Sequence, residues 1–102
     1  MSITQQTVGT SATTIFTSTN SSAITAIYLM NDDSSAVTVQ VHVVANGDSA
    51  GASNKIIKDL VISAGDTYIV DTERLILDNG DTIQASADTG SVLHSTISYI
   101  GV

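Results

Sequence analysis

The clearest feature of the sequence is an alternation of apolar and polar residues between positions 36 and 44. Valine occupies every second position from 37 to 43, and Thr38, Gln40 and His42 stand between the valines. A period of two is typical of a β-strand, because successive side chains in a strand point to opposite faces. The segment is therefore predicted to be a strand with one face on the core and one face in water.

The preceding segment, residues 23–30, is apolar at positions of both parities. A strand of this kind is either central in a sandwich or covered by another subunit. In the second case, the residues of one parity would form a contact with that subunit. These candidate interface residues are Ile24, Ala26, Tyr28 and Met30.

Short apolar segments bounded by turn residues continue along the chain, and none of them shows the apolar spacing of a helix. Residues 1–22 are rich in Ser and Thr with few apolar residues, which predicts one or two edge strands or an arm. All 102 residues are therefore expected to form a single all-β domain, a sandwich or barrel of about seven to nine short strands. The later strands are expected at residues 55–62, 68–70, 74–77, 83–87 and 92–100.

The composition of the sequence argues against several classes of function. The net charge is −7 with only three Lys and Arg residues, whereas nucleic-acid binding requires clustered basic residues. The absence of Cys excludes disulfides, cysteine metal sites and thiol catalysis. No apolar segment approaches the ~18 residues of a membrane helix, and no signal peptide is visible at the start of the sequence. Neither nucleic acid nor a membrane is therefore expected as a partner.

One motif resembles a catalytic site. Residues 47–51, Gly-Asp-Ser-Ala-Gly, match the G-x-S-x-G pattern of a hydrolase nucleophile, and Asp71 and His94 follow in the order of a catalytic triad. That motif requires a strand before the serine and a helix after it, whereas small polar residues typical of a loop follow Ser49. The motif is therefore interpreted as a polar loop, and the protein is not expected to be an enzyme.

The histidines and the acidic segments are also interpreted as structural rather than as metal-binding residues. His42 and His94 fall on the polar faces of predicted strands and are interpreted as surface or interface histidines, because no third metal ligand is suitably spaced. Three acidic segments, at 32–33, 71–73 and 78–81, do not match a calcium-binding loop and are interpreted as solvated turns. No cofactor and no metal are expected.

Five segments carry a resemblance to a known group of proteins. They are residues 24–31 (ITAIYLMN), 36–41 (AVTVQV), 62–67 (ISAGDT), 75–87 (LILDNGDTIQASA) and 95–100 (STISYI). In this order they resemble the small all-β virion proteins of tailed bacteriophages, which include head-decoration and tail-associated proteins. The segment 75–87 is the most specific of the five.

The resemblance implies a jelly-roll-like antiparallel β-sandwich with a structural role in the virion, and it supplies no catalytic residues. The leading hypothesis is a capsid decoration or cement protein, made in the host cytoplasm, that binds the outside of the head. The alternative is a tail component such as an adaptor, a baseplate subunit or a fibre-anchoring subunit. The expected partners are other copies of the chain, in a homotrimer, and the major capsid protein or tail proteins.

Overall fold

The computed structural model of the chain describes residues 2–70 and 75–101, and within these ranges it contains nine strands, one 3₁₀ turn and no α-helix. This confirms the all-β class predicted from the sequence. The strands are β1 (Ser2–Val8), β2 (Thr13–Thr17), β3 (Ser22–Asn31), β4 (Val37–Val44), β5 (Lys55–Ile62), β6 (Thr67–Val70), β7 (Leu75–Leu77), β8 (Thr82–Ala87) and β9 (Leu93–Gly101), and the 3₁₀ turn η1 spans Ala52–Asn54.

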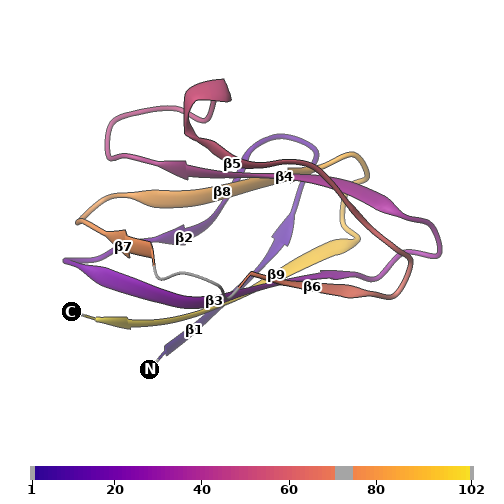
Figure 1. Cartoon of the computed structure of the whole chain (residues 1–102), viewed down its shortest axis with the longest axis horizontal. Coiled ribbons are helices and arrows are strands. Elements are labelled where there is room, and N and C mark those ends of the chain that lie inside the picture. Colours follow the sequence, from indigo (N-terminus) through magenta and orange to yellow (C-terminus); the bar gives the residue numbers. More distant parts are fainter. Residues whose placement is uncertain (1, 71–74, 102) are drawn as a thin grey trace.

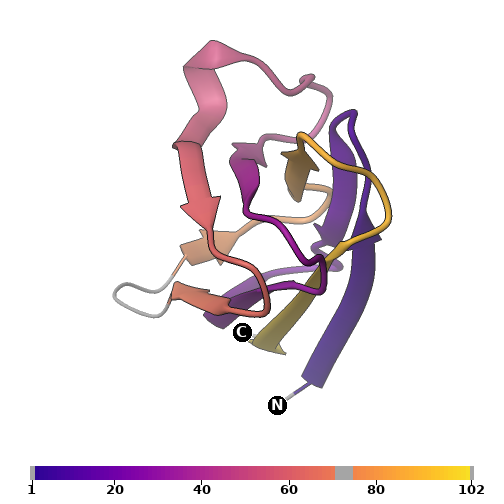
Figure 2. The same cartoon turned by 90° about the vertical axis from the view of Figure 1, so that its right-hand side faces the viewer.

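The strands form two antiparallel sheets that pack face to face (Figures 1 and 2). Sheet A has the order β1-β9-β3-β6, and β7 also pairs with β3, at the N-terminal end of that strand. Sheet B has the order β2-β8-β4-β5. The two strands from the first 22 residues, β1 and β2, each lie at one edge of a sheet.

The order of pairing is that of a jelly roll. Strands from the first half of the chain pair with strands from the second half in reverse order: β1 with β9, β2 with β8, β3 with β6 and β7, and β4 with the adjacent β5. The chain therefore behaves as one long hairpin rolled into two sheets, with β6 and β7 together in the place of a single strand. This confirms the fold class implied by the resemblance.

The core lies between the sheets and follows the predicted alternation. Val37, Val39 and Val41 of β4 are fully buried there, and Phe16 of β2 packs edge-on against Tyr99 of β9 with ring centroids 4.7 Å apart. A bulge in β2 between Thr14 and Phe16 shifts the register and places adjacent apolar residues of this strand in the core. The other large, fully buried core side chains are Val8, Ile15, Ile27, Leu29, Ile83, Leu93 and Ile97.

A buried asparagine connects the two sheets. Asn31, at the end of β3, has no exposed surface, and its Nδ2 donates to the carbonyl oxygens of Ser35 (2.9 Å) and Ile62 (3.0 Å), the latter at the end of β5. Its Oδ1 accepts a hydrogen bond from the backbone N–H of Asp33. Among the described residues no buried side-chain polar atom lacks a partner, so this polar contact between sheets is fully satisfied.

Candidate functional site

The outer face of sheet A, which points away from the core, carries exposed apolar side chains on neighbouring strands. Tyr28 of β3 is 39% exposed and lies directly opposite Ile69 of β6, which is 48% exposed. Met30 is two residues further along β3, and Ile76 of β7 lies opposite Ala23 of the same strand. We call these four exposed residues, Tyr28, Met30, Ile69 and Ile76, the outer-face patch.

The structure separates the four residues that the sequence proposed as an interface. Tyr28 and Met30 belong to the outer-face patch, and Ala26 lies on the same side of the sheet, half-buried. Ile24 instead points into the core and is 3% exposed, so its expected place on this surface is wrong. The reason is a bulge at Thr25, whose hydroxyl donates to Ser98, and the extra residue reverses the alternation of side chains along β3.

Sheet A contains no formally charged side chain in any of its five strands. The sequences of β1, β3, β6, β7 and β9 include no Asp, Glu, Lys or Arg, although the chain has a net charge of −7. Among the strands of sheet B, β5 carries Lys55, Lys58 and Asp59, and the other described charges lie in loops. A partner that covers the strands of sheet A would therefore remove no side-chain charge of these strands from water, a removal that would be costly.

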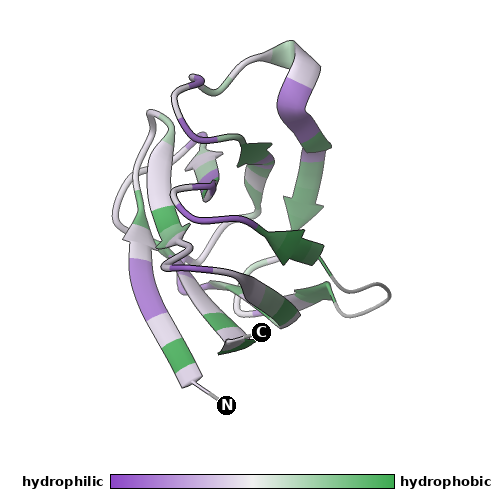
Figure 3. Ribbon diagram, turned by 90° about the vertical axis from the view of Figure 1, so that its left-hand side faces the viewer, coloured by the Kyte–Doolittle hydropathy of each residue, from purple (hydrophilic) through white to green (hydrophobic). Residues whose placement is uncertain are grey.

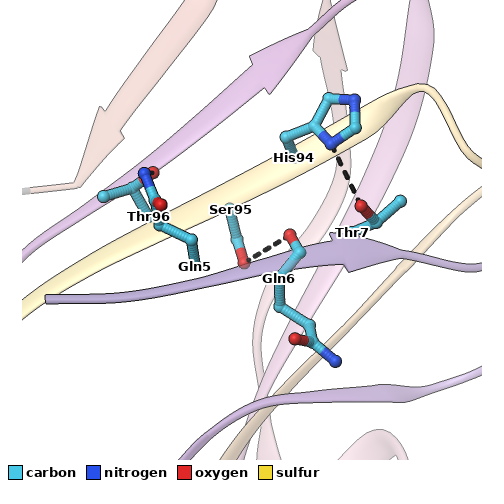
Figure 4. Close-up of a pocket in the computed structure, with 6 residues that line it drawn as sticks. All are labelled: Gln5, Gln6, Thr7, His94, Ser95 and Thr96. Atoms are coloured by element: carbon cyan, nitrogen blue, oxygen red, sulfur yellow. Dashed lines mark hydrogen bonds between the residues drawn. The ribbon is translucent and has the colours of Figure 1, made fainter.

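Next to the outer-face patch, the same sheet has a polar hollow between β1 and β9, with a volume of about 390 Å³ (Figure 4). Thr7 and His94 are joined by a hydrogen bond of 3.2 Å between Oγ1 and Nδ1. The Oγ of Ser95 donates to the carbonyl oxygen of Gln6 at 3.1 Å. The residues that line the hollow are Gln5, Gln6, Thr7, His94, Ser95 and Thr96.

The lining of this hollow can exchange hydrogen bonds with a polar ligand or a protein surface. It provides amide, hydroxyl and imidazole groups and no carboxylate, so it offers no carboxylate pair for acid–base chemistry. His94 lies on the polar side of β9, where the sequence placed it, with Thr7 as its neighbour.

The outer face of sheet B is partly covered by the chain itself. The loop of residues 45–54, which contains η1, folds over the outside of β4 (Figure 1). His42 lies beneath it with 6% of its surface exposed, and its Nδ1 contacts the Gly51 carbonyl oxygen (3.1 Å) and Asn54 Oδ1 (3.0 Å). Because both partners are acceptors, Nδ1 carries the proton.

The interpretation of His42 as a surface histidine is therefore wrong. Its position in β4 does point away from the core, as the alternation predicts. The loop of residues 45–54 then returns over it and removes it from water. Nothing in the pattern of β4 itself indicates this cover.

The hydrolase-like motif does not form a nucleophile site. Ser49 is exposed in the loop, its carbonyl oxygen accepts a hydrogen bond from Asn54, and a turn of only three residues follows in place of a helix. His94 belongs to sheet A, whereas Ser49 lies in the loop over sheet B, and Asp71 lies outside the described residues. No hydrogen bond joins Ser49 to a histidine in the part of the chain that the structure describes.

Several of the described acidic side chains accept hydrogen bonds from backbone N–H groups of the chain. Asp81 accepts from the backbone of Asp78 and of Asn46, both at 2.9 Å, and Asp88 accepts from Thr38 at 3.1 Å. Within residues 2–70 and 75–101 no group of three His, Cys, Asp or Glu residues is arranged to hold a metal ion. The acidic segment 71–73 lies outside these ranges.

The sequence pattern missed the contribution of β6 and β7 to the outer-face patch. Ile69 and Ile76 come from short apolar segments whose residues of both parities are apolar, the same signal that identified β3. The pairing that brings these segments beside Tyr28 and Ala23 could not be deduced from that signal alone.

Comparisons with family models, curated proteins and solved structures give no match for this chain. The described residues include no helix that is long and apolar enough to cross a membrane.

Proposed function

We propose that the chain is a non-enzymatic structural protein of a tailed-phage virion, a capsid decoration protein that binds the outside of the head and stabilises it. The observation that carries this proposal is the outer-face patch of sheet A, whose apolar side chains are exposed on strands without formal charge and are covered by no described loop. Exposed apolar surface that gathers on one face marks a binding site for another macromolecule.

The two sides of the sandwich fit this role. The outer-face patch would contact the capsid, and the adjacent hydroxyl and amide groups of β1 and β9 would provide hydrogen bonds at its rim. The charged residues of β5 and of the loops would remain in water on the other side. Jelly rolls occur in viral capsid proteins but also in lectins and cupins, so the fold supports the proposal only by analogy.

The available surface is large enough for such a contact. A standard protein interface buries about 800 Å² on each partner. The described chain exposes 5399 Å², so a contact of this size would use about 15% of its surface. This is compatible with an interface centred on one face of one sheet.

The proposed partners are the major capsid protein and other copies of the chain. The resemblance in sequence implies a homotrimer, and burial between protomers would add stability to a small core that has no disulfide. A tail location is the alternative, with the same face bound to an adaptor, baseplate or fibre protein.

The proposal can be tested by electron cryomicroscopy of virions of the phage that encodes the chain, with and without its gene. We expect density on the outside of the head that disappears in the deletion, together with lower resistance of the heads to heat. Density found at the tail alone would replace the head assignment with the tail alternative. Particles with no density for the chain would overturn both.

Purified variants then test which face binds. Tyr28→Lys places a charge in the outer-face patch and should abolish rebinding to heads that lack the protein. Gln40→Lys is the matched control, because Gln40 lies in a central strand of sheet B and contacts Asp59 on the outer side. If Gln40→Lys loses rebinding and Tyr28→Lys retains it, the binding surface is on sheet B, and the assignment to sheet A is wrong.

A further inference from the structure

The four edges of the two sheets differ in their protection against pairing with another strand. An edge strand exposes unpaired backbone N–H and C=O groups, and proteins block such edges with charges, bulges, prolines or short strands. In sheet B, β2 has five residues and a bulge, and β5 carries Lys55, Lys58 and Asp59 with two register shifts. Figure 3 shows the hydrophilic positions that interrupt β5. In sheet A, β6 and β7 share one edge and have only four and three residues.

The remaining edge, β1, has none of these features. It has seven residues, and it pairs with β9 in unbroken register from Ser2 opposite Tyr99 to Val8 opposite Leu93. Its sequence, SITQQTV, contains no charged residue, no proline and no glycine. Ile3 on its outer side is 67% exposed, the highest value among the large apolar residues described as exposed. This edge is open for a further strand.

We infer that β1 pairs antiparallel with β1 of a second copy of this chain, so that sheet A continues across two protomers. Two copies that use the same surface are related by a twofold axis. For two antiparallel edge strands this axis is perpendicular to the sheet, so residues on the outer face of one copy stay on the outer face of the other. Residues that lie opposite each other therefore have the same parity.

These conditions select one register. A twofold axis through Gln5 pairs all seven residues of β1, from Ser2 with the second copy's Val8 to Val8 with the second copy's Ser2. An axis through Thr4 or Gln6 pairs only the five residues common to both copies. The axis through Gln5 therefore forms the most backbone hydrogen bonds.

The side chains of β1 are compatible with this register. The two Gln5 amides meet at the axis, and each amide provides both donors and an acceptor. Among residues 2–70 and 75–101 this amide makes a single long contact, 3.5 Å from Nε2 to Thr96 Oγ1, which leaves room for a stronger partner. On the same face Ile3 lies opposite the second copy's Thr7, a pair of β-branched residues that suits antiparallel strands.

The charge distribution favours a second copy as the occupant. Two chains of net charge −7 repel each other, but none of the strands of sheet A carries a formal charge. The contact through β1 therefore joins two strands that carry no formal charge. It also leaves no charge on β1 for which a different partner would have to supply a counter-charge.

The pairing would have a consequence for the proposed function, although it does not depend on that function. Because the axis is perpendicular to the sheet, both outer-face patches point in the same direction. The pair presents two equivalent contact surfaces to one substrate surface, which raises the effective affinity. A twofold pair also differs from the homotrimer implied by the resemblance, so a measured mass separates the two.

The first experiment is light scattering coupled to gel filtration at high micromolar concentration. We expect twice the 10.5 kDa mass of one chain for the wild type. Gln5→Lys and Gln5→Glu each place like charges on the axis and should give monomers, whereas an equimolar mixture of the two should recover the pair. Thr14→Lys, on the exposed side of β2, is the control and should keep the wild-type mass. A wild-type monomer or trimer overturns the inference, as does a mixture that remains monomeric.

The second experiment uses the absence of cysteine from the chain. Residues directly opposite in antiparallel strands have Cα atoms about 4.5–5.5 Å apart, which a disulfide can bridge. Gln5→Cys should therefore form a covalent pair under mild oxidation. Thr4→Cys, one residue away, and Thr14→Cys on β2 should react at least tenfold more slowly, since neither lies on the axis. Equal rates for the three variants would overturn the register and the edge assignment.

Discussion

The outer faces of sheets A and B differ in how far loops of the chain cover them. On sheet B the loop of residues 45–54 returns over β4 and buries His42, and Val44 on the same side is also buried. On sheet A no described loop performs this role, and Tyr28, Ile69 and Ile76 remain exposed. Within residues 2–70 and 75–101 the chain therefore covers part of the outer face of sheet B, around β4, and leaves the outer-face patch of sheet A open. Apolar exposure on sheet B is found on its edge strand β5, at Ile56 and Val61.

The cover of sheet B is held at two places. His42 contacts the loop near Gly51, and the backbone N–H of Asn46 donates to Asp81 in the turn that precedes β8. The outer-face patch of sheet A has no comparable contacts with the rest of the described chain. The predictions below test whether the two faces differ as these contacts indicate.

The largest effect is expected when the connection between the sheets is removed. Asn31→Ala leaves the buried carbonyl oxygen of Ile62 and the partly buried one of Ser35 without their side-chain donor, and we expect a loss of about 3 kcal/mol in the free energy of unfolding. Asn79→Ala is the control, because Asn79 accepts one exposed hydrogen bond from Asn20 and should cost at most about 0.5 kcal/mol. Urea unfolding measures both, and equal losses would contradict the role of Asn31.

A smaller effect is expected in the two Gly-Asp-Thr turns. Residues 65–67 lead into β6 of sheet A, and residues 80–82 lead into β8 of sheet B. Gly80 and Gly65 both have positive φ, which costs any other residue about 1 kcal/mol. A Cβ at Gly80 would lie 2.6 Å from Asn46 Cγ, whereas one at Gly65 meets nothing within 4 Å. We expect Gly80→Ala to destabilise by about 2 kcal/mol and Gly65→Ala by about 1 kcal/mol.

The difference between the two glycines should disappear in a chain that also carries Asn46→Ala, because the contact with the loop is then removed. Thermal unfolding should be measured for Gly80→Ala and Gly65→Ala, each with and without Asn46→Ala. A difference that persists without the Asn46 side chain would show that the loop is not its cause.

The two histidines provide a matched pair across the sheets. His42→Ala removes partly buried hydrogen bonds to the loop, and we expect a loss of about 1 kcal/mol and faster amide hydrogen exchange in residues 45–54. His94→Ala removes one exposed contact with Thr7 and should change stability by less than about 0.5 kcal/mol. Unchanged exchange in the loop of the His42→Ala variant would mean that this residue does not hold the cover.

The smallest change in stability is expected on the exposed face itself. Tyr28→Thr combined with Ile69→Thr should alter the free energy of unfolding by less than about 0.5 kcal/mol, because both residues lie on the exposed face, at 39% and 48% exposure, and threonine retains a high strand propensity. The same variant should bind much less of a hydrophobic dye such as bis-ANS. Val61→Thr on the outer side of β5 is the control, and an equal loss of dye binding there would remove the distinction between the faces.

The fold class was predictable from the sequence because the relevant patterns of apolar and polar residues lie within single strands. The alternation in β4 and the lack of helical spacing were sufficient for an all-β sandwich or barrel, and the resemblance added the jelly-roll topology. The position of Ile24 was not predictable, because one extra residue at Thr25 reverses the parity of a strand that is apolar on both sides. The two polar residues in that part of β3, Ser22 and Thr25, have opposite parities and so do not indicate which parity faces the core.

Only the part of the candidate site that lies on β3 was predicted, because the pattern within one strand does not show which other strands pair with it. Tyr28 and Met30 lie in the segment that the sequence identified, but Ile69 and Ile76 join them through long-range pairing. His42 was misplaced because its burial depends on a loop of small polar residues, whose path is determined by hydrogen bonds to Gly51 and Asn54. Period-two patterns contain no information on such contacts.

The central position of β9 in sheet A affects how the chain folds during synthesis. β9 lies between β1 and β3, yet it is translated after both of them. At about 5–20 residues per second, the roughly 60 residues between the end of β3 and the start of β9 take about 3–12 s to make. Throughout this interval β1 and β3 lack the strand that joins them. Sheet A therefore closes only when β9 has left the ribosome, and the nascent chain depends on that single late strand to avoid pairing with its neighbours on the same messenger.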